Sequence, residues 1–272
     1  MKRFILTFFF VNTTVFGSFE GYEYGSKSIA MGCAFTGLSN DCFSIFYNPA
    51  GLANSKYNEV AFFLSPYQFG LKELSTTVIV ANYHTKYGTI GFAGKKFGFE
   101  LYQELTGSIV YANQFNKINL GTTININSLT IKNYGNDITL GLDVGVLLPL
   151  MSKFYIGFNI KNINAPTIGR KKEKLPQILL SGVSYRPVDD FLITFDLQKE
   201  YKSDLSFASG AEYKIYDLAS LRIGMRNIPS TYSAGIGVEY NFLRLDYAFL
   251  SHQQLGISHS ITISIIFGGR DG

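Results

Sequence analysis

Residues 117–131 read KINLGTTININSLTI, and the alternation in this stretch decides the fold. Successive side chains of a β-strand point to opposite faces, so a period of two separates an apolar face from a polar one. The two faces here are Ile118, Leu120, Thr122, Ile124 and Ile126 against Asn119, Gly121, Thr123, Asn125 and Asn127. The stretch therefore predicts one long β-strand.

The same period continues through most of the chain. Turn signals rich in Gly, Pro, Asn and Asp divide residues 59–267 into about fourteen segments of about ten residues each. Among them are the alternating runs 138–148, 154–161, 191–198, 221–226, 232–242 and 261–267. A soluble β-sandwich would charge its outer face heavily, whereas only 16% of the residues of the whole chain are charged and the polar face is mostly Ser, Thr, Asn and Gly.

An even number of strands of this length predicts an all-β fold, a transmembrane antiparallel β-barrel of about fourteen strands over residues 59–267. Closure pairs every backbone amide and leaves no sheet edge facing lipid. The apolar face would contact outer-membrane lipid, and the polar face would line the lumen. Residues 268–272 would form a short C-terminal tail, and insertion would need the barrel-assembly machinery.

The start of the chain predicts a signal peptide over residues 1–18. Lys2 and Arg3 supply its basic region, residues 4–11 its apolar region, and Val15–Ser18 a cleavage site with small residues. We therefore expect export and a place in the outer membrane of a Gram-negative-type cell.

Between this peptide and the strands lies a segment of different composition. Residues 30–53 read AMGCAFTGLSNDCFSIFYNPAGLA, rich in Gly, Ala and Ser. Asp41 is expected to cap a short helical turn, and Asn48 before Pro49 marks a helix start, because Asn accepts a backbone N–H bond and Pro needs no donor there. Residues 19–58 are thus either an ordinary N-terminal arm or a partly helical plug inside the barrel. Of these two alternatives we predict the plug. Its hinge or latch would be Asn48, Pro49, Ala50, Gly51 and Leu52.

The sequence offers little for catalysis. Its three histidines have no carboxylate at a motif spacing, and it has no phosphate-binding glycine loop or metal-ligand cluster, so we predict no enzyme, no cofactor and no metal site. Cys33 and Cys42, in an exported chain, are either a local disulfide or two unpaired buried residues. The basic cluster Arg170–Lys174 is interpreted as a solvated loop, which gives no reason to expect a nucleic-acid partner.

Charged residues on the polar face would project into the lumen. Because opposite signs nearly balance, we expect them to pair across neighbouring strands and to brace or constrict the interior, not to form a charge-selective pore. By this face assignment the lumen charges are Lys161, Arg186, Lys214, Arg222, Arg226 and Arg244 with Asp143, Asp196, Glu212, Glu239 and Asp246.

Two motifs resemble the PorV/PorQ family, within the wider group of FadL-like outer-membrane proteins. The first is Phe46–Leu52, FYNPAGL, and the second is Leu245–Phe249, LDYAF, followed by Leu255-Gly256 and Ser258-His259. The resemblance implies a barrel of about fourteen strands with a short N-terminal segment inside. The chain departs from the family pattern at Cys33, at Cys42 and in its residues beyond Phe267, which leaves the mobility of the segment and the efficiency of insertion open.

The resemblance implies two functions. One is a non-enzymatic role in type IX secretion, as in PorV, with secretion-system components as partners. The alternative is a hatch-gated transporter of hydrophobic small molecules such as fatty acids, which predicts an apolar path beside the plug and a lateral gap in the barrel wall.

Overall fold

The structure is a computed structural model that describes residues 18, 19, 21, 23–55, 57–201, 203–216 and 218–269. Apart from Ser18, the expected signal peptide lies outside the described residues. Among them, no helix has the length and apolar character needed to cross a membrane.

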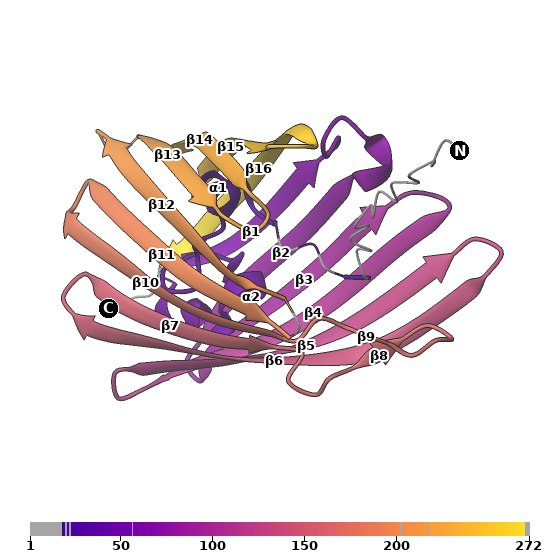
Figure 1. Ribbon diagram of the computed structural model, residues 1–272. Coiled ribbons are helices and arrows are strands. Elements are labelled where there is room, and N and C mark those ends of the chain that lie inside the picture. Colours follow the sequence, from indigo (N-terminus) through magenta and orange to yellow (C-terminus); the bar gives the residue numbers. More distant parts are fainter. Residues whose placement is uncertain are drawn as a thin grey trace, which may run out of the picture.

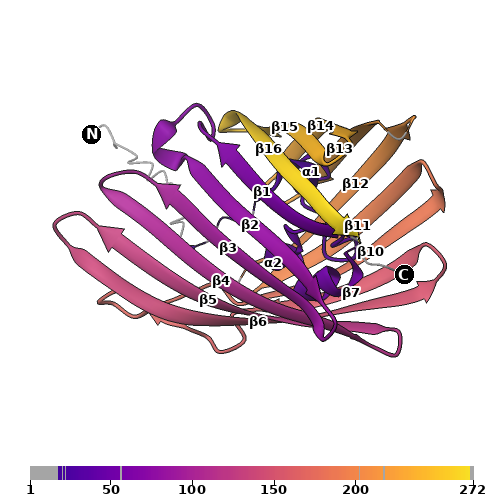
Figure 2. The ribbon, with the colours of Figure 1, turned by 180° about the vertical axis from the view of Figure 1, so that it is seen from behind.

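Fourteen antiparallel strands form one closed barrel, which confirms the predicted fold (Figure 1). Each strand pairs with its neighbours in the chain, and β1 pairs with β16 to close the ring, as Figure 2 shows from behind. The barrel strands are β1 Tyr57–Ser65, β2 Thr76–Thr85, β3 Gly88–Gly98, β4 Tyr102–Phe115, β5 Ile118–Ile131, β6 Gly135–Met151, β7 Phe154–Lys161, β10 Ile178–Val188, β11 Phe191–Glu200, β12 Leu205–Ile215, β13 Ala219–Arg226, β14 Thr231–Tyr240, β15 Leu243–His252 and β16 Gly256–Gly269.

The polar face of the strands points inward and the apolar face outward. In β5, Asn119, Gly121 and Thr123 are buried, whereas Ile124 and Ile126 are exposed on the outside. An exposed apolar exterior around a buried polar interior is the reverse of a soluble protein and is the arrangement that lipid requires. β16 also includes Gly268 and Gly269, which the sequence had placed in the tail.

The two ends of the barrel differ. One end, which we call the turn end, has tight connections such as residues 86–87, 116–117, 152–153 and 241–242, together with the start of β1 and the end of β16. The other, the loop end, has the longer connections 66–75, with the 3₁₀ helix η2 (Lys72–Leu74), and 162–177. In outer-membrane barrels, short turns face the periplasm and longer loops face outward.

The connection 162–177, expected as a plain loop, contains a small hairpin of β8 (Thr167–Ile168) and β9 (Glu173–Lys174). Ile168 and Leu175 are buried in an apolar cluster with Phe19 and Leu129. The loop also covers an edge, because the first half of β6 extends beyond the short β7. There the Ile163 N–H donates to the Leu142 carbonyl at 2.9 Å, and the Asn164 amide bonds to the backbone of Leu142 and Leu140.

The N-terminal segment lies inside the barrel, as predicted (Figures 1 and 2). It contains α1 (Ser26–Ala30), α2 (Ser44–Tyr47) and the 3₁₀ helix η1 (Pro49–Asn54). Asn48 caps η1 as expected, with its Oδ1 accepting from the Ala50 N–H at 3.2 Å and Pro49 in the first turn. Asp41 instead accepts from the Phe43 N–H at 3.0 Å and stabilises the turn before α2 without capping it.

Candidate functional site

The candidate site is the contact between the barrel wall and residues 23–55, here called the plug. Eight inward-facing glycines form its seat, and in every one an added Cβ atom would lie within 3.0 Å of a plug atom. Register places three pairs of them directly opposite each other on neighbouring strands: Gly121 with Gly145, Gly157 with Gly182, and Gly210 with Gly224. This glycine ring consists of Gly91, Gly121, Gly145, Gly157, Gly182, Gly210, Gly224 and Gly235.

Because these positions have no side chain, the plug backbone approaches the wall backbone directly. The backbone of Pro49 and Ala50 occupies the space that a Cβ atom of Gly121 would need. Backbone atoms of Met31 and Gly32 occupy the corresponding space at Gly224. The latch motif is therefore packed against β5, while the start of the plug is packed against β13.

Polar side chains of the wall bind the backbone of the plug around the whole ring. Three wall side chains accept from plug N–H groups: Thr262 Oγ1 from Ser26 at 2.9 Å, Ser233 Oγ from Gly32 at 3.1 Å, and Glu59 Oε2 from Cys42 at 3.2 Å. Two others donate to plug carbonyls: Ser184 Oγ to Gly37 at 2.8 Å, and Asn159 Nδ2 to Tyr47 at 2.9 Å. These bonds give partners to plug backbone groups, most of which lie outside its short helices.

Two residues make paired contacts. Asp196 Oδ2 on β11 accepts from the N–H groups of Phe35 and Thr36 at 2.9 and 2.7 Å. Asn48 donates from Nδ2 to the carbonyls of Thr36 and Val146, both at 3.0 Å, while its Oδ1 caps η1. One asparagine thus joins two parts of the plug and strand β6.

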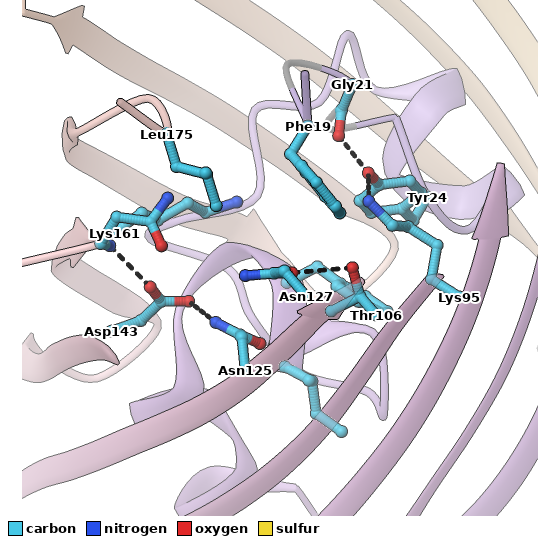
Figure 3. A pocket seen from close by; sticks show the side chains of 13 residues that line it. Phe19, Gly21, Tyr24, Lys95, Thr106, Asn125, Asn127, Asp143, Lys161 and Leu175 are labelled. Atoms are coloured by element: carbon cyan, nitrogen blue, oxygen red, sulfur yellow. Dashed lines mark hydrogen bonds between the residues drawn. The ribbon is translucent and has the colours of Figure 1, made fainter. Parts of the chain in front are cut away.

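A small cavity of about 60 Å³ lies between the plug and the loop end (Figure 3). Its apolar side consists of Phe19, Tyr24, Ile45, Phe46 and Leu175, and its polar side of Lys95, Thr106, Asn125, Asn127, Asp143, Lys161 and Asn162. A space of this size holds a few water molecules or one small chemical group, and drug-sized ligands need several times more.

The polar side chains of the cavity are held by one another. Asp143 accepts from Asn125 Nδ2 at 2.9 Å and from the Asn162 N–H at 2.8 Å. Lys95 Nζ donates to the Tyr24 hydroxyl at 3.1 Å and lies 5.3 Å from the ring centre of Phe19. The lining is therefore preorganised and amphipathic, not the continuous apolar path that a long hydrophobic substrate would need.

Ion pairs at the turn end form two groups, together called the turn-end network, of which the group around Arg222 is buried. Arg222 donates from Nε to Glu212 at 2.7 Å and from Nη1 to Asp246 at 2.5 Å, and all three side chains are at most 5% exposed. Arg244 bonds to Glu59 at 3.2 Å and to Glu239 at 2.9 Å. The network braces β12 to β15 and β1, and through Glu59 it continues into the plug.

The other sequence-derived lumen charges lie at several places along the barrel wall. Asp143 and Lys161 line the cavity, Asp196 holds the plug, and Arg226 lies 3.6 Å from Glu23 of the plug. Arg186 lies 3.8 Å from Glu212, and Glu239 is exposed at the strand end. Lys214 is half-buried near the turn end.

Sequence reasoning missed three inward charges, Glu59, Lys95 and Glu104, although each bonds to the N-terminal segment. Their strands alternate less regularly than residues 117–131. For Glu104 a signal was nevertheless present, because it shares the alternating polar face of Thr106 and Ser108, and the polar face of a membrane strand points to the lumen.

The two cysteines are free and buried, so of the two alternatives the structure has the unpaired one and not the disulfide. Burial raises the pKa of the Cys33 thiol to about 11. Burial, reinforced by the nearby carboxylates of Glu59 and Asp41, raises the pKa of Cys42 well above its usual range.

Neither thiol is expected to react with maleimide at pH 8 while the barrel is folded. A raised pKa leaves almost no thiolate, which is the nucleophilic form, and the plug excludes the reagent. Labelling measured by mass spectrometry should be near zero in mild detergent and should reach both cysteines after heating in denaturant without reductant. Rapid labelling of the folded protein would contradict the packed plug, and failure to label after unfolding would indicate a disulfide.

No protein-family model and no curated protein matches the chain. Solved structures do match. CymD, a monoaromatic hydrocarbon channel, superposes with a TM-score of 0.66 at 13% identity, over 89% of this chain and 97% of that chain. The Pseudomonas putida toluene transporter TodX gives 0.64 at 11% identity, over 89% and 96%. A Pseudomonas aeruginosa FadL homologue gives 0.59 at 12% identity, over 89% and 97%. The chain therefore shares their fold over nearly its whole described length.

Proposed function

We propose that this chain is a non-enzymatic barrel of the outer membrane that admits small hydrophobic molecules, with the plug as the barrier. The observation that carries the proposal is the cavity at the loop end, which stops at the plug aromatics Tyr24 and Phe46. The structures that share the fold support it, since CymD is a monoaromatic hydrocarbon channel and TodX is a toluene transporter.

The size of the cavity sets a condition on transport. About 60 Å³ accepts only a small group, and every pair of neighbouring barrel strands is hydrogen-bonded. Among the described residues, neither the apolar path nor the lateral gap predicted for a conduit is present in this conformation. Passage therefore requires the plug to shift on its glycine ring, and small, compact substrates need the smallest shift.

A second function is favoured by a different observation. The plug is bonded to strands at separate places around the barrel, among them β1 through Glu59, β6 through Val146 and β11 through Asp196. A barrel that is permanently filled suits a scaffold in secretion, as the PorV-like motif around Asn48 implies. In that role the plug stays in place and the loop end binds secretion components.

Proteoliposome uptake of toluene and of a fatty acid distinguishes the two functions. Asp196→Ala removes two plug–wall hydrogen bonds, and the matched control Asp189→Ala removes an exposed carboxylate at the turn end that pairs with Lys153. Transport predicts uptake by the wild type, faster uptake by Asp196→Ala, and no change for Asp189→Ala.

If neither the wild type, Asp196→Ala nor a deletion of residues 30–53 takes up either compound, the transport proposal fails and the scaffold is favoured. Co-purification of secretion components with the wild-type barrel would then be expected. Recovery of the protein from soluble periplasm, without heat-modifiable migration on a gel, would exclude both functions.

A further inference from the structure

The tip of the β8–β9 hairpin carries an unbalanced charge. Residues 170–174 read RKKEK, four basic side chains against one acidic, and all five residues are exposed. The lumen charges, in contrast, nearly balance and mostly pair. None of the ion pairs formed by the described residues involves Arg170, Lys171, Lys172 or Lys174.

The tip is held in a defined conformation. The Lys172 N–H donates to the Gly169 carbonyl at 2.9 Å in a tight turn, and the Gly169 N–H donates to Asp137 Oδ2 at 2.6 Å. Below the tip, the buried side chains of Ile168 and Leu175 anchor the hairpin to the barrel. The four cations are therefore presented on a fixed support, so less conformational entropy is lost when they bind a partner than in a flexible tail.

The tip also lies close to the lipid-facing belt. Ile163 and Leu179 flank the hairpin in the chain, and they are 45% and 51% exposed. Leu179 pairs with the exposed Ile160 on the outer surface. The hairpin thus leaves the barrel where the apolar exterior ends, which in a membrane is the level of the lipid headgroups.

We propose that the hairpin tip, residues 170–174, binds the phosphate groups of lipopolysaccharide in the outer leaflet. Its location at the loop end faces the tip outward, and clusters of four or more Lys and Arg residues beside an apolar belt bind anionic headgroups. Arg170 offers a planar pair of N–H donors for a phosphate, and the lysines add flexible charge. The proposal rests on the outer-membrane location but not on transport.

Binding of purified barrel to lipopolysaccharide micelles tests this site. The triple variant R170Q/K171Q/K174Q should bind on the order of a hundredfold more weakly than the wild type, because three charges near an anionic surface are lost. Lys172 stays unchanged because its backbone lies in the left-handed region, with φ of 50°. The matched control K86Q/K117Q/K214Q removes three charges from the turn end and should bind like the wild type.

Three further arms identify the ligand. Dephosphorylated lipopolysaccharide should bind the wild type no better than the triple variant, phosphatidylglycerol should bind more weakly, and millimolar inorganic phosphate should not compete. Equal binding by both triple variants would overturn the proposal, as would competition by inorganic phosphate, which indicates a site for the free anion. Heat-modifiable migration of each variant shows that the barrel is folded, and fractionation of the wild type checks its membrane location separately.

Discussion

Substitution of Gly224 by alanine is expected to displace the plug and destabilise the barrel. The new Cβ atom would lie within 3.0 Å of Met31 and Gly32 backbone atoms, which belong to a chain held on both sides by further bonds. Overpacking typically costs about 1–3 kcal/mol, and a clash with backbone belongs at the upper end because no rotamer change relieves it. A displaced plug also opens the lumen.

The measurements are the temperature at which the folded band disappears on a gel and the conductance in a planar bilayer. Gly224→Ala should lower the temperature at which the folded band disappears and should raise the conductance. Gly107→Ala is the matched control, since a Cβ on this strand glycine meets no atom within 4 Å. Equal stability and conductance for the two variants would show that the glycine ring does not hold the plug.

Substitution of Arg222 by alanine is expected to destabilise the barrel by about 3–5 kcal/mol. It leaves the carboxylates of Glu212 and Asp246 buried without their main partner, and buried charges without a counterion are costly. The effect should appear as a lower midpoint of urea unfolding.

The triple variant E212Q/R222M/D246N is the informative comparison. It removes all three charges together, so much of the lost stability should return, as happens when a buried ion network is replaced by neutral side chains of similar size. If Arg222→Ala unfolds like the wild type, the network contributes no bracing. If the triple variant is as unstable as the single one, the loss comes from packing and not from charge.

The barrel was predictable from residues such as Ile124 and Asn125, because neighbouring side chains of a strand point to opposite faces, one toward lipid and the other toward the lumen. The role of Gly121 was not. It was one more small residue on the polar face, and only the position of Pro49 in space shows that its missing side chain makes room for the plug.

The same limit applies to the candidate site. Asn48 and Pro49 predicted a helix start correctly, because a helix cap depends on local geometry alone. The second use of Asn48, as a bridge between Thr36 and Val146, depends on contacts far apart in the chain, and no local pattern encodes it. The β8–β9 hairpin was missed for a related reason, because two-residue strands are too short to show a period.

The bond between Ser26 and Thr262 joins residues 236 positions apart. The plug precedes all the barrel strands in the chain, yet its full set of partners exists only when β16, the last strand, is in place. Contacts between distant parts of a chain form slowly because a large loop must close first. The plug therefore reports on the completion of assembly: a barrel that lacks its final strand leaves Ser26 without its partner, and protease resistance of the plug would mark the moment at which the ring has closed.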